Sequence, residues 1–251
     1  MRVLAVLLLA STALLADDGR QILKDAEARH RSRTQEYEGV LTVTSKDGKV
    51  RRKSWKSYRE GYAGDARQLI RFTDPPEVRG VGFLSVGKKG KSPDQWLYLP
   101  SMKRERRIAA QDREASFVGT DFSYEDLDEL DESAFEISVE PSETEGGQDC
   151  HVLELRPKER SQYERKRVFV RKSDLYVARV DSYRKGQKEP FKRFLALDIA
   201  TVEGHVAARR LEMRDLGKGS TTVVLLEKLS FDKAQPADRF TLQNLNREGG
   251  D

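Results

Sequence analysis

The sequence has few of the residue types that disulfides, metal sites and membrane spans require. It holds one cysteine, Cys150, which excludes an intrachain disulfide, so a large buried core must hold the fold together. No apolar run after the first residues is long enough to span a bilayer. The histidines, His30, His151 and His205, lack metal-ligand spacing. We therefore expect no metal and no cofactor.

A strong excess of charge of one sign is also missing. The formal net charge is +4, although 35% of the residues are charged. A nucleic-acid-binding protein usually carries a concentrated excess of one sign. Here Lys and Arg are spread over many segments of mixed charge, which suits the wet face of a β-sheet. The sequence therefore predicts no binding to nucleic acid.

What the chain does have at its start is a short apolar run. Arg2 precedes Val3–Leu15, which is too short to span a bilayer and has the length of the apolar region of a signal peptide. We expect a signal peptide at residues 1–16, cleaved after Ala16, with Ala13 as the alternative. No cysteine follows the run, so no lipidation site is present there. The pattern predicts a soluble, exported protein.

Beyond this run the hydrophobic pattern changes from helical to strand periodicity. Residues 17–33 predict a helix with a modest apolar stripe. Residues 37–44 then alternate apolar and polar positions, and Asp47-Gly48 predicts a hairpin turn. About ten strands joined by hairpins follow up to residue 229. This predicts a mainly β protein with few helices: one domain, residues 17–251, built on an antiparallel sheet that must curl or close.

Candidate catalytic and phosphate-binding motifs fail one by one. Gly90-Lys91-Ser92 lacks the first glycine of a phosphate-binding loop, because Ser85 stands there, and it lies between strands. Cys150 and His151 are adjacent in a strand and face opposite sides. The acidic residues 121–132 lack the pattern of a calcium loop, and we interpret them as a solvated helix face. We expect no enzyme, although a paired-carboxylate hydrolase stays an alternative.

A basic group follows the strand that ends at Leu99. Its members are Lys103, Arg104, Arg106 and Arg107. They fit either a solvated turn or a docking patch for an acidic partner or an anionic lipid headgroup. Cations without interleaved aromatic residues do not predict a platform for nucleic acid.

Eight of the candidate cavity residues are aromatic, and all eight fall in the first half of the chain. A strongly curved sheet covered by few helical residues has more concave surface than those helices can fill. We therefore expect an apolar hollow that takes ligands of long-chain character. Its candidate lining residues are Leu41, Val43, Trp55, Phe72, Phe83, Leu84, Trp96, Tyr98, Phe117, Phe122 and Tyr124.

Several of these residues fall in motifs of a known family. The chain has YEGVLTV at residues 37–43, D-P-P-x-x-x-G-V-G-F-L at 74–84, WLYLP at 96–100 and S-F-x-G-T-D-F-S-Y-E-D-L at 116–127. It resembles the outer-membrane lipoprotein-sorting protein family, the LolA/LolB-like carriers of lipids and lipoproteins. It looks most like the branch associated with resistance-nodulation-division (RND, MMPL-type) exporters. The resemblance covers nearly the whole chain after the apolar run.

The resemblance implies a half-open antiparallel β-barrel with helices as a lid over an apolar interior. Its function would be that of a monomeric carrier that takes acyl chains from an inner-membrane machine. Phe117, Phe122 and Tyr124 fall where lid residues would be. A strand arginine tethers the lid in the known carriers, and Arg51, Arg52 and Arg71 are the candidates here. The alternative is a periplasmic adaptor that docks on a transporter and carries no cargo.

Overall fold

The structure is a computed structural model that describes residues 18–88 and 91–247. The predicted signal peptide and its cleavage site at Ala16 lie outside the described residues. The predicted helix is found at residues 18–30. None of the helices in the described residues is both long and apolar enough to cross a membrane.

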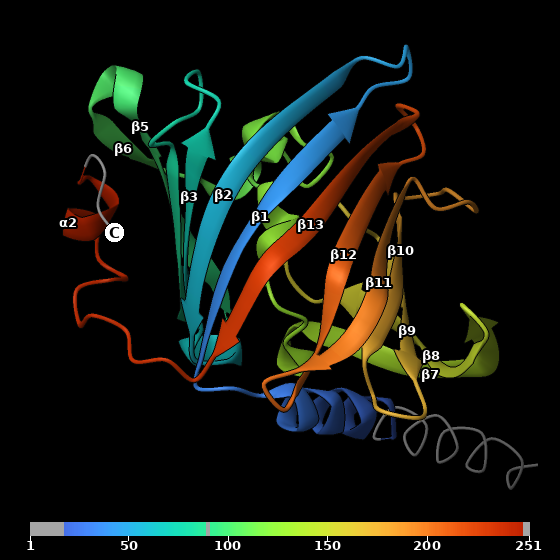
Figure 1. The fold of residues 1–251 in the computed structure, drawn as a ribbon. Helices are drawn as coiled ribbons and strands as arrows, with labels where there is room; N and C mark the ends of the chain where they lie inside the picture. The colour runs from blue at the N-terminus through green and yellow to red at the C-terminus, as the bar shows by residue number, and fades with distance from the viewer. Residues whose placement is uncertain (1–17, 89–90, 248–251) are drawn as a thin grey trace, which may run out of the picture. The chain divides into compact units, whose positions relative to one another are not determined.

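Strands make up most of the described chain, and they pair in antiparallel fashion. Within the described residues they form one sheet of thirteen strands in the order β6-β5-β4-β3-β2-β1-β13-β12-β11-β10-β9-β8-β7, with β6 and β7 as open edges (Figure 1). The predicted fold class, an antiparallel sheet that does not close into a barrel, is confirmed. The strands are β1 (Thr34–Thr44), β2 (Val50–Glu60), β3 (Arg67–Asp74), β4 (Gly82–Lys88), β5 (Lys91–Leu99), β6 (Arg104–Arg107), β7 (Phe135–Glu145), β8 (Gln148–Pro157), β9 (Arg165–Arg171), β10 (Val177–Tyr183), β11 (Lys192–Val202), β12 (His205–Asp215) and β13 (Ser220–Phe231).

Hairpin turns and one close contact set the register of the first strands. Gly48 has φ +79° in the turn between β1 and β2, as the Asp-Gly pair predicts. Gly39 lies at a register shift between β1 and β13, where a Cβ would come within 2.1 Å of the Leu225 carbonyl oxygen. A side chain at this position would therefore separate the two strands.

The chain divides into two compact units. Unit 1 contains Met1–Arg31 and Leu130–Ala196, and unit 2 contains Ser32–Glu129 and Leu197–Asp251. The expectation that residues 17–251 act as one domain stays a prediction.

Unit 1 packs its helix on one face of its strands. Leu23 and Ala26 of the helix are buried against Phe135 and Ile137 of β7 and the apolar residues of β8 and β9. The approach is close, since a Cβ on Gly19 would lie 2.8 Å from Ile137 Cγ2. The modest apolar stripe predicted from the sequence is therefore the face that contacts the sheet.

A second apolar cluster in unit 1 involves the single cysteine. Cys150 packs with Val152 and Phe169, and all three are fully buried. The guanidinium groups of Arg167 and Arg179 lie 5.3 and 4.5 Å from the centre of the Phe169 ring. Burial raises the pKa of the Cys150 thiol. The cysteine is therefore a packed core residue.

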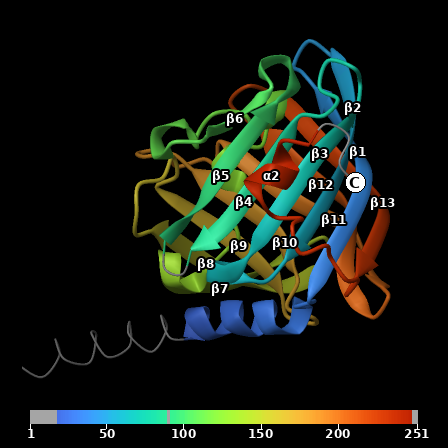
Figure 2. The same cartoon turned by 90° about the vertical axis from the view of Figure 1, so that its left-hand side faces the viewer.

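Unit 2 buries both faces of strands β3–β5. Ile70 of β3 belongs to one apolar cluster, whereas its neighbour Leu69 belongs to another on the opposite face. The second face is covered by the C-terminal segment, where α2 (Leu242–Leu245) lies against β4 (Figure 2). Phe240 and Leu245 of this segment are buried in the second cluster.

The acidic segment differs from its prediction. A solvated helix face at residues 121–132 is wrong, since Tyr124–Leu127 form a single 3-10 turn, Glu132 begins another, and Asp121 is 5% exposed. The Asp121 carboxylate accepts hydrogen bonds from side chains of β13, and the Asp128 carboxylate accepts one from β5. The carboxylates fix this segment to the sheet, which the local pattern of charge does not reveal.

Candidate ligand-binding site

A segment of short 3-10 turns covers the first apolar face of unit 2. We call residues 110–129 the flap; it contains turns at Ala110–Asp112, Phe117–Gly119 and Tyr124–Leu127. Its two buried aromatic side chains, Phe117 and Tyr124, pack on the sheet. The flap therefore occupies the face where the sequence predicts an apolar hollow.

Aromatic rings make the central contact between flap and sheet. The Phe117 ring lies 5.3 Å from that of Phe83 and 5.8 Å from that of Phe72, measured between centroids. The Tyr124 ring lies 6.0 Å from that of Phe83. Burial raises the pKa of the Tyr124 phenol. These are edge and tilted contacts of the kind that stabilise aromatic pairs by ~1 kcal/mol beyond area burial.

The structure separates the predicted lining residues into two groups. One group lies in the cluster beneath the flap: Leu41, Val43, Phe72, Phe83, Phe117 and Tyr124 are buried there, with Trp55 and Phe122 partly buried at its margin. The other group, Leu84, Trp96 and Tyr98, packs with Phe240 and Leu245 on the opposite face. Adjacent residues of a strand face opposite sides, so Phe83 and Leu84 cannot share a cavity.

Sequence reasoning missed part of the cluster under the flap. The missing members are aliphatic, and strand alternation with the predicted aromatic residues could have found those in β3 and β5. They are Ile70, Val81, Leu97, Ile108, Val224 and Leu226.

Hydrogen bonds attach the flap to β13. The Ser220 hydroxyl donates to one carboxylate oxygen of Asp121, and the Thr222 hydroxyl donates to the other at 2.7 Å. The Thr222 hydroxyl also accepts from the Asp121 N–H at 2.9 Å. Thr222 is fully buried and Asp121 is 5% exposed, so this latch is shielded from water.

The C-terminal end of the flap is fastened to β5. The Gln95 amide donates to the Tyr124 carbonyl oxygen at 3.1 Å and to Asp128 Oδ1 at 3.0 Å. The Arg113 guanidinium pairs with the same Asp128 carboxylate. Gln95 is 1% exposed. Buried polar groups therefore hold the flap near its middle and near its C-terminal end, and the rings of Phe117 and Tyr124 contact the sheet.

A lysine ties the middle of the flap to β2. Lys53 Nζ donates to the Val118 carbonyl oxygen at 2.5 Å. Of the candidate arginines, Arg51 lines a pocket, Arg52 is exposed, and Arg71 donates to the carbonyl of Asn244 at 2.9 Å. Lys53 therefore ties the middle of the flap to β2, and Arg59, which is also on β2, pairs with Glu129 at the end of the flap.

The ammonium of this tether is buried. Lys53 is 8% exposed, and among the described residues its hydrogen-bond partner is a carbonyl and not a carboxylate. Burial, followed by the nearby charge of Arg51, lowers the pKa of Lys53. A buried cation without a counterion is unfavourable.

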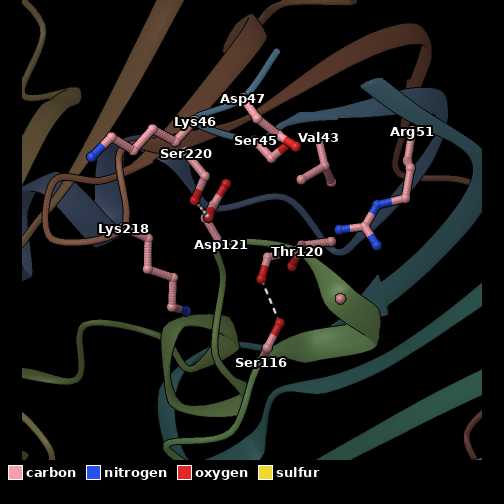
Figure 3. A pocket seen from close by; sticks show the side chains of 11 residues that line it. Val43, Ser45, Lys46, Asp47, Arg51, Ser116, Thr120, Asp121, Lys218 and Ser220 are labelled. Carbon is pink, nitrogen blue, oxygen red and sulfur yellow. Dashed lines mark hydrogen bonds between the residues drawn. The ribbon is translucent and has the colours of Figure 1, made fainter. Parts of the chain in front are cut away.

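A pocket of about 700 Å³ adjoins this tether at the ends of the strands. Its walls come from the turn between β1 and β2, the turn between β12 and β13, and the flap from Ser116 to Asp121. Figure 3 shows Arg51 on one side and Lys46 and Lys218 on the other, with Asp121 and Ser220 between them. Val43 lines the pocket and also belongs to the apolar cluster, so the pocket borders the cluster.

The basic group lies at the open edge of the sheet. Lys103, Arg104, Arg106 and Arg107 are all exposed, on or just before the edge strand β6. Arg106 Nη2 lies 3.7 Å from Asp112 Oδ2, and the Arg107 guanidinium pairs with the Asp94 carboxylate. Their role in docking stays a prediction. In the described residues, no three His, Cys, Asp or Glu side chains gather to hold a metal ion.

Solved structures share this fold. A putative outer membrane lipoprotein-sorting protein domain from Vibrio parahaemolyticus is 24% identical, with TM-score 0.87 over 92% of this chain and 100% of that chain. A DUF1329 family protein from Desulfovibrio piger is 27% identical, with TM-score 0.86 over 92% of this chain and 99% of that chain. A LolA superfamily protein from Nitrosomonas europaea is 18% identical, with TM-score 0.70 over 89% of this chain and 97% of that chain.

These structures confirm the resemblance inferred from the sequence motifs. No curated protein matches the sequence. A family model whose description reads "Uncharacterized protein" matches residues 64–247, which is more than half of the chain. The chain therefore belongs to that family, and its fold is that of the outer-membrane lipoprotein-sorting proteins of the LolA superfamily.

Proposed function

We propose that the protein is a periplasmic carrier that binds the acyl chains of a lipid or lipoprotein and moves this cargo toward the outer membrane. The acyl chain binds on the apolar face that the flap covers. The observation that carries the proposal is the flap itself, which lays Phe117 and Tyr124 on an apolar sheet face and is fastened by hydrogen bonds through Asp121 and Asp128. The likeness to lipoprotein-sorting proteins supports it.

Binding requires the flap to move, and hydrophobic burial supplies the free energy. Each buried CH₂ contributes ~0.8 kcal/mol, so ten buried methylenes gain roughly 8 kcal/mol before the cost of displacing the flap. The acyl chain replaces the apolar contacts that Phe83 and Phe72 lose when Phe117 leaves. Cargo leaves when a receiver offers a better apolar site. No catalytic step is needed.

The compartment and partner belong to the same proposal. The apolar run at residues 3–15 supports export, with the mature chain beginning after Ala16. The protein acts as a monomer and receives its cargo from an inner-membrane RND/MMPL-type transporter. Lys103, Arg104, Arg106 and Arg107 form the docking surface, and their exposure at the sheet edge supports this role.

The exposed basic edge also favours a second candidate function, that of an adaptor without cargo. Reversing the charge of Arg104 and Arg106 to Glu separates the two functions. A carrier loses docking to the transporter but still takes up lipid. An adaptor loses docking and shows no lipid uptake in either form.

The two tryptophans allow a direct test of where an acyl chain binds. Trp55 borders the cluster under the flap, whereas Trp96 packs on the opposite face. We would titrate brominated fatty acid, a fluorescence quencher, into Trp96→Phe and Trp55→Phe proteins, each of which keeps one tryptophan. We expect strong quenching of Trp55 and weak quenching of Trp96.

Native mass spectrometry of the protein purified from the periplasm provides the second readout. We expect lipid to co-purify and to be lost on extraction with organic solvent. A protein that carries no lipid and shows no quenching of either tryptophan contradicts the carrier. Quenching of Trp96 alone contradicts the site beneath the flap.

A further inference from the structure

The pocket beside the flap has the chemistry of an anion site. Three cations line it, Lys46, Arg51 and Lys218, together with several hydroxyl groups (Figure 3). Arg51 and Lys46 form no ion pair within the part of the chain that the structure describes. Lys218 forms an ion pair with Asp215, which does not line the pocket; Lys218 Nζ lies 3.1 Å from Asp215 Oδ2. Two of the three cations therefore have their charge available to a ligand.

The carboxylates of the pocket do not neutralise these cations. Asp121 accepts the hydroxyl hydrogens of Ser220 and Thr222. Asp47 accepts the hydroxyl hydrogen of Ser45 at 2.5 Å. Both carboxylates are thus engaged with neutral donors in the walls, and neither is paired with a cation.

A fourth cation lies close to the pocket but is not one of its lining residues. Gly119 lines the pocket, and a Cβ on it would lie 3.7 Å from Lys53 Nζ. Lys53 is buried and is bonded to the carbonyl of Val118. An anion in the pocket would supply the counterion that this buried ammonium lacks.

One face of β2 becomes less polar from Arg51 toward Trp55. Arg51, Lys53 and Trp55 alternate with residues that face the other side, so they form one row from the pocket into the apolar cluster. The row is about 13 Å long at the usual rise of a strand. Val43 and Leu41 pair with Arg51 and Lys53 across the hairpin. The row therefore has a cationic end at the pocket and an apolar end in the cluster.

We propose that this pocket binds the anionic phosphate or phosphodiester headgroup of an amphiphile whose acyl chain lies beneath the flap. The inference rests on the proposed carrier function and names the class of its ligand. Arg51 and Lys53 hold the headgroup oxygens, and Lys46 and Lys218 add positive charge at the mouth. The headgroup competes with the Val118 carbonyl for Lys53, so headgroup binding also loosens the flap.

The experiment compares ligands that share one acyl chain. Lyso-phosphatidylglycerol carries an anionic phosphodiester, lyso-phosphatidylcholine is neutral overall, and monoacylglycerol has no phosphate. Binding is followed by Trp55 fluorescence in the full chain and by calorimetry, with inorganic phosphate as a separate ligand. We expect lyso-phosphatidylglycerol to bind about tenfold more tightly than monoacylglycerol at low salt, with the advantage falling as salt rises.

Three variants assign this advantage to the pocket. Arg51→Glu and Lys53→Met should each abolish the preference for the anionic ligand while monoacylglycerol still binds. Lys53→Met removes a buried charge without a counterion, so the variant is expected to fold. Arg52→Glu is the matched control, because Arg52 is exposed and faces the other side of β2. It should keep the preference.

The outcomes separate the pocket from the carrier. Equal binding of all three amphiphiles overturns the headgroup site and leaves the carrier standing. Failure of every amphiphile to bind overturns the carrier and the headgroup site with it. Inorganic phosphate that binds as tightly as lyso-phosphatidylglycerol overturns the amphiphile and identifies a site for the free anion. A preference lost equally in Arg52→Glu assigns it to general surface charge and also overturns the pocket.

Discussion

Asp181 and Lys53 show two ways in which this chain buries a charged side chain. Asp181 is 1% exposed, and its carboxylate accepts hydrogen bonds from Arg179 and Arg193. Burial alone would raise the pKa of Asp181, but the two guanidinium groups outweigh it and hold that pKa below its usual value. Lys53 donates to a carbonyl and has no carboxylate partner among the described residues, and burial lowers its pKa. The first charge is compensated by ion pairs, whereas the second is not.

Acid should destabilise the protein through Asp181. Its pKa is depressed in the folded state, so its contribution is fully present above the unfolded value, near 3.8, and is lost as the pH falls through the lower folded pKa. Asp181→Asn should flatten the pH dependence of the free energy of unfolding in this range. It should also lower that free energy at neutral pH by roughly 3 kcal/mol. Urea midpoints measured from pH 7 to pH 2 check both effects. Asp149→Asn, at an exposed site of the same unit, should keep the wild-type profile.

Single residues of the site were predictable to different degrees. The aromatic residues under the flap follow from their strands, and alternation alone places Leu84 away from Phe83. The roles of Lys53 and Asp121 have no local signal, because their partners are 65 and 101 residues away in the sequence. Contacts of that length depend on where the flap docks.

At the scale of elements, turns and alternation identify the strands more reliably than charge identifies a helix. The Asp-Gly turn between β1 and β2 is found where it was predicted. Gly87 and Pro93 favour a turn over residues 87–93, but β4 extends to Lys88 and β5 already begins at Lys91. Pro93 is tolerated there next to a register shift between β4 and β5. Glycine and proline together overstate the length of this turn.

The latch at Asp121 should control the opening of the flap. In Asp121→Ala, the Ser220 and Thr222 hydroxyls lose a buried acceptor, which costs about 1–3 kcal/mol. We expect faster hydrogen exchange at the Thr120 amide, which is bonded within the flap, and faster uptake of a fluorescent fatty acid.

Exchange in β8 and β9 serves as the internal reference, since those strands lie in unit 1. Glu227→Ala on the same strand as Thr222 is the control, because Glu227 is exposed. Unchanged exchange at Thr120 in Asp121→Ala would show that the latch does not hold the flap.

The C-terminal segment should stabilise unit 2 through one leucine of α2. Leu245 is fully buried against β3–β5, whereas Leu242 on the same turn is 38% exposed. Leu245→Ala should lower the free energy of unfolding by about 2–5 kcal/mol, and Leu242→Ala by less than about 0.5 kcal/mol. Chemical unfolding of both variants measures the difference. Equal effects would mean that the segment is not docked as described.

At the scale of the whole molecule, the succession of hairpins predicts an antiparallel sheet, and the order of its strands confirms this. Strand count is less predictable, because weak strands such as Arg104–Arg107 have no apolar face. The sequence alone also does not tell which strands meet when they are far apart. The pairing of β1 with β13 is of this kind.

That pairing has a consequence for the order in which the protein folds. Gln35 of β1 pairs with Phe231 of β13. This pairing cannot form until β13 has been synthesised, long after β1. Contacts over such sequence distances form slowly, because the intervening chain must first be ordered. A chain interrupted before Ser220 has β2 to pair with β1 but lacks β13, its second partner, and also both hydroxyls that hold Asp121. Arrival of the final strand therefore completes the sheet and fastens the flap in a single event.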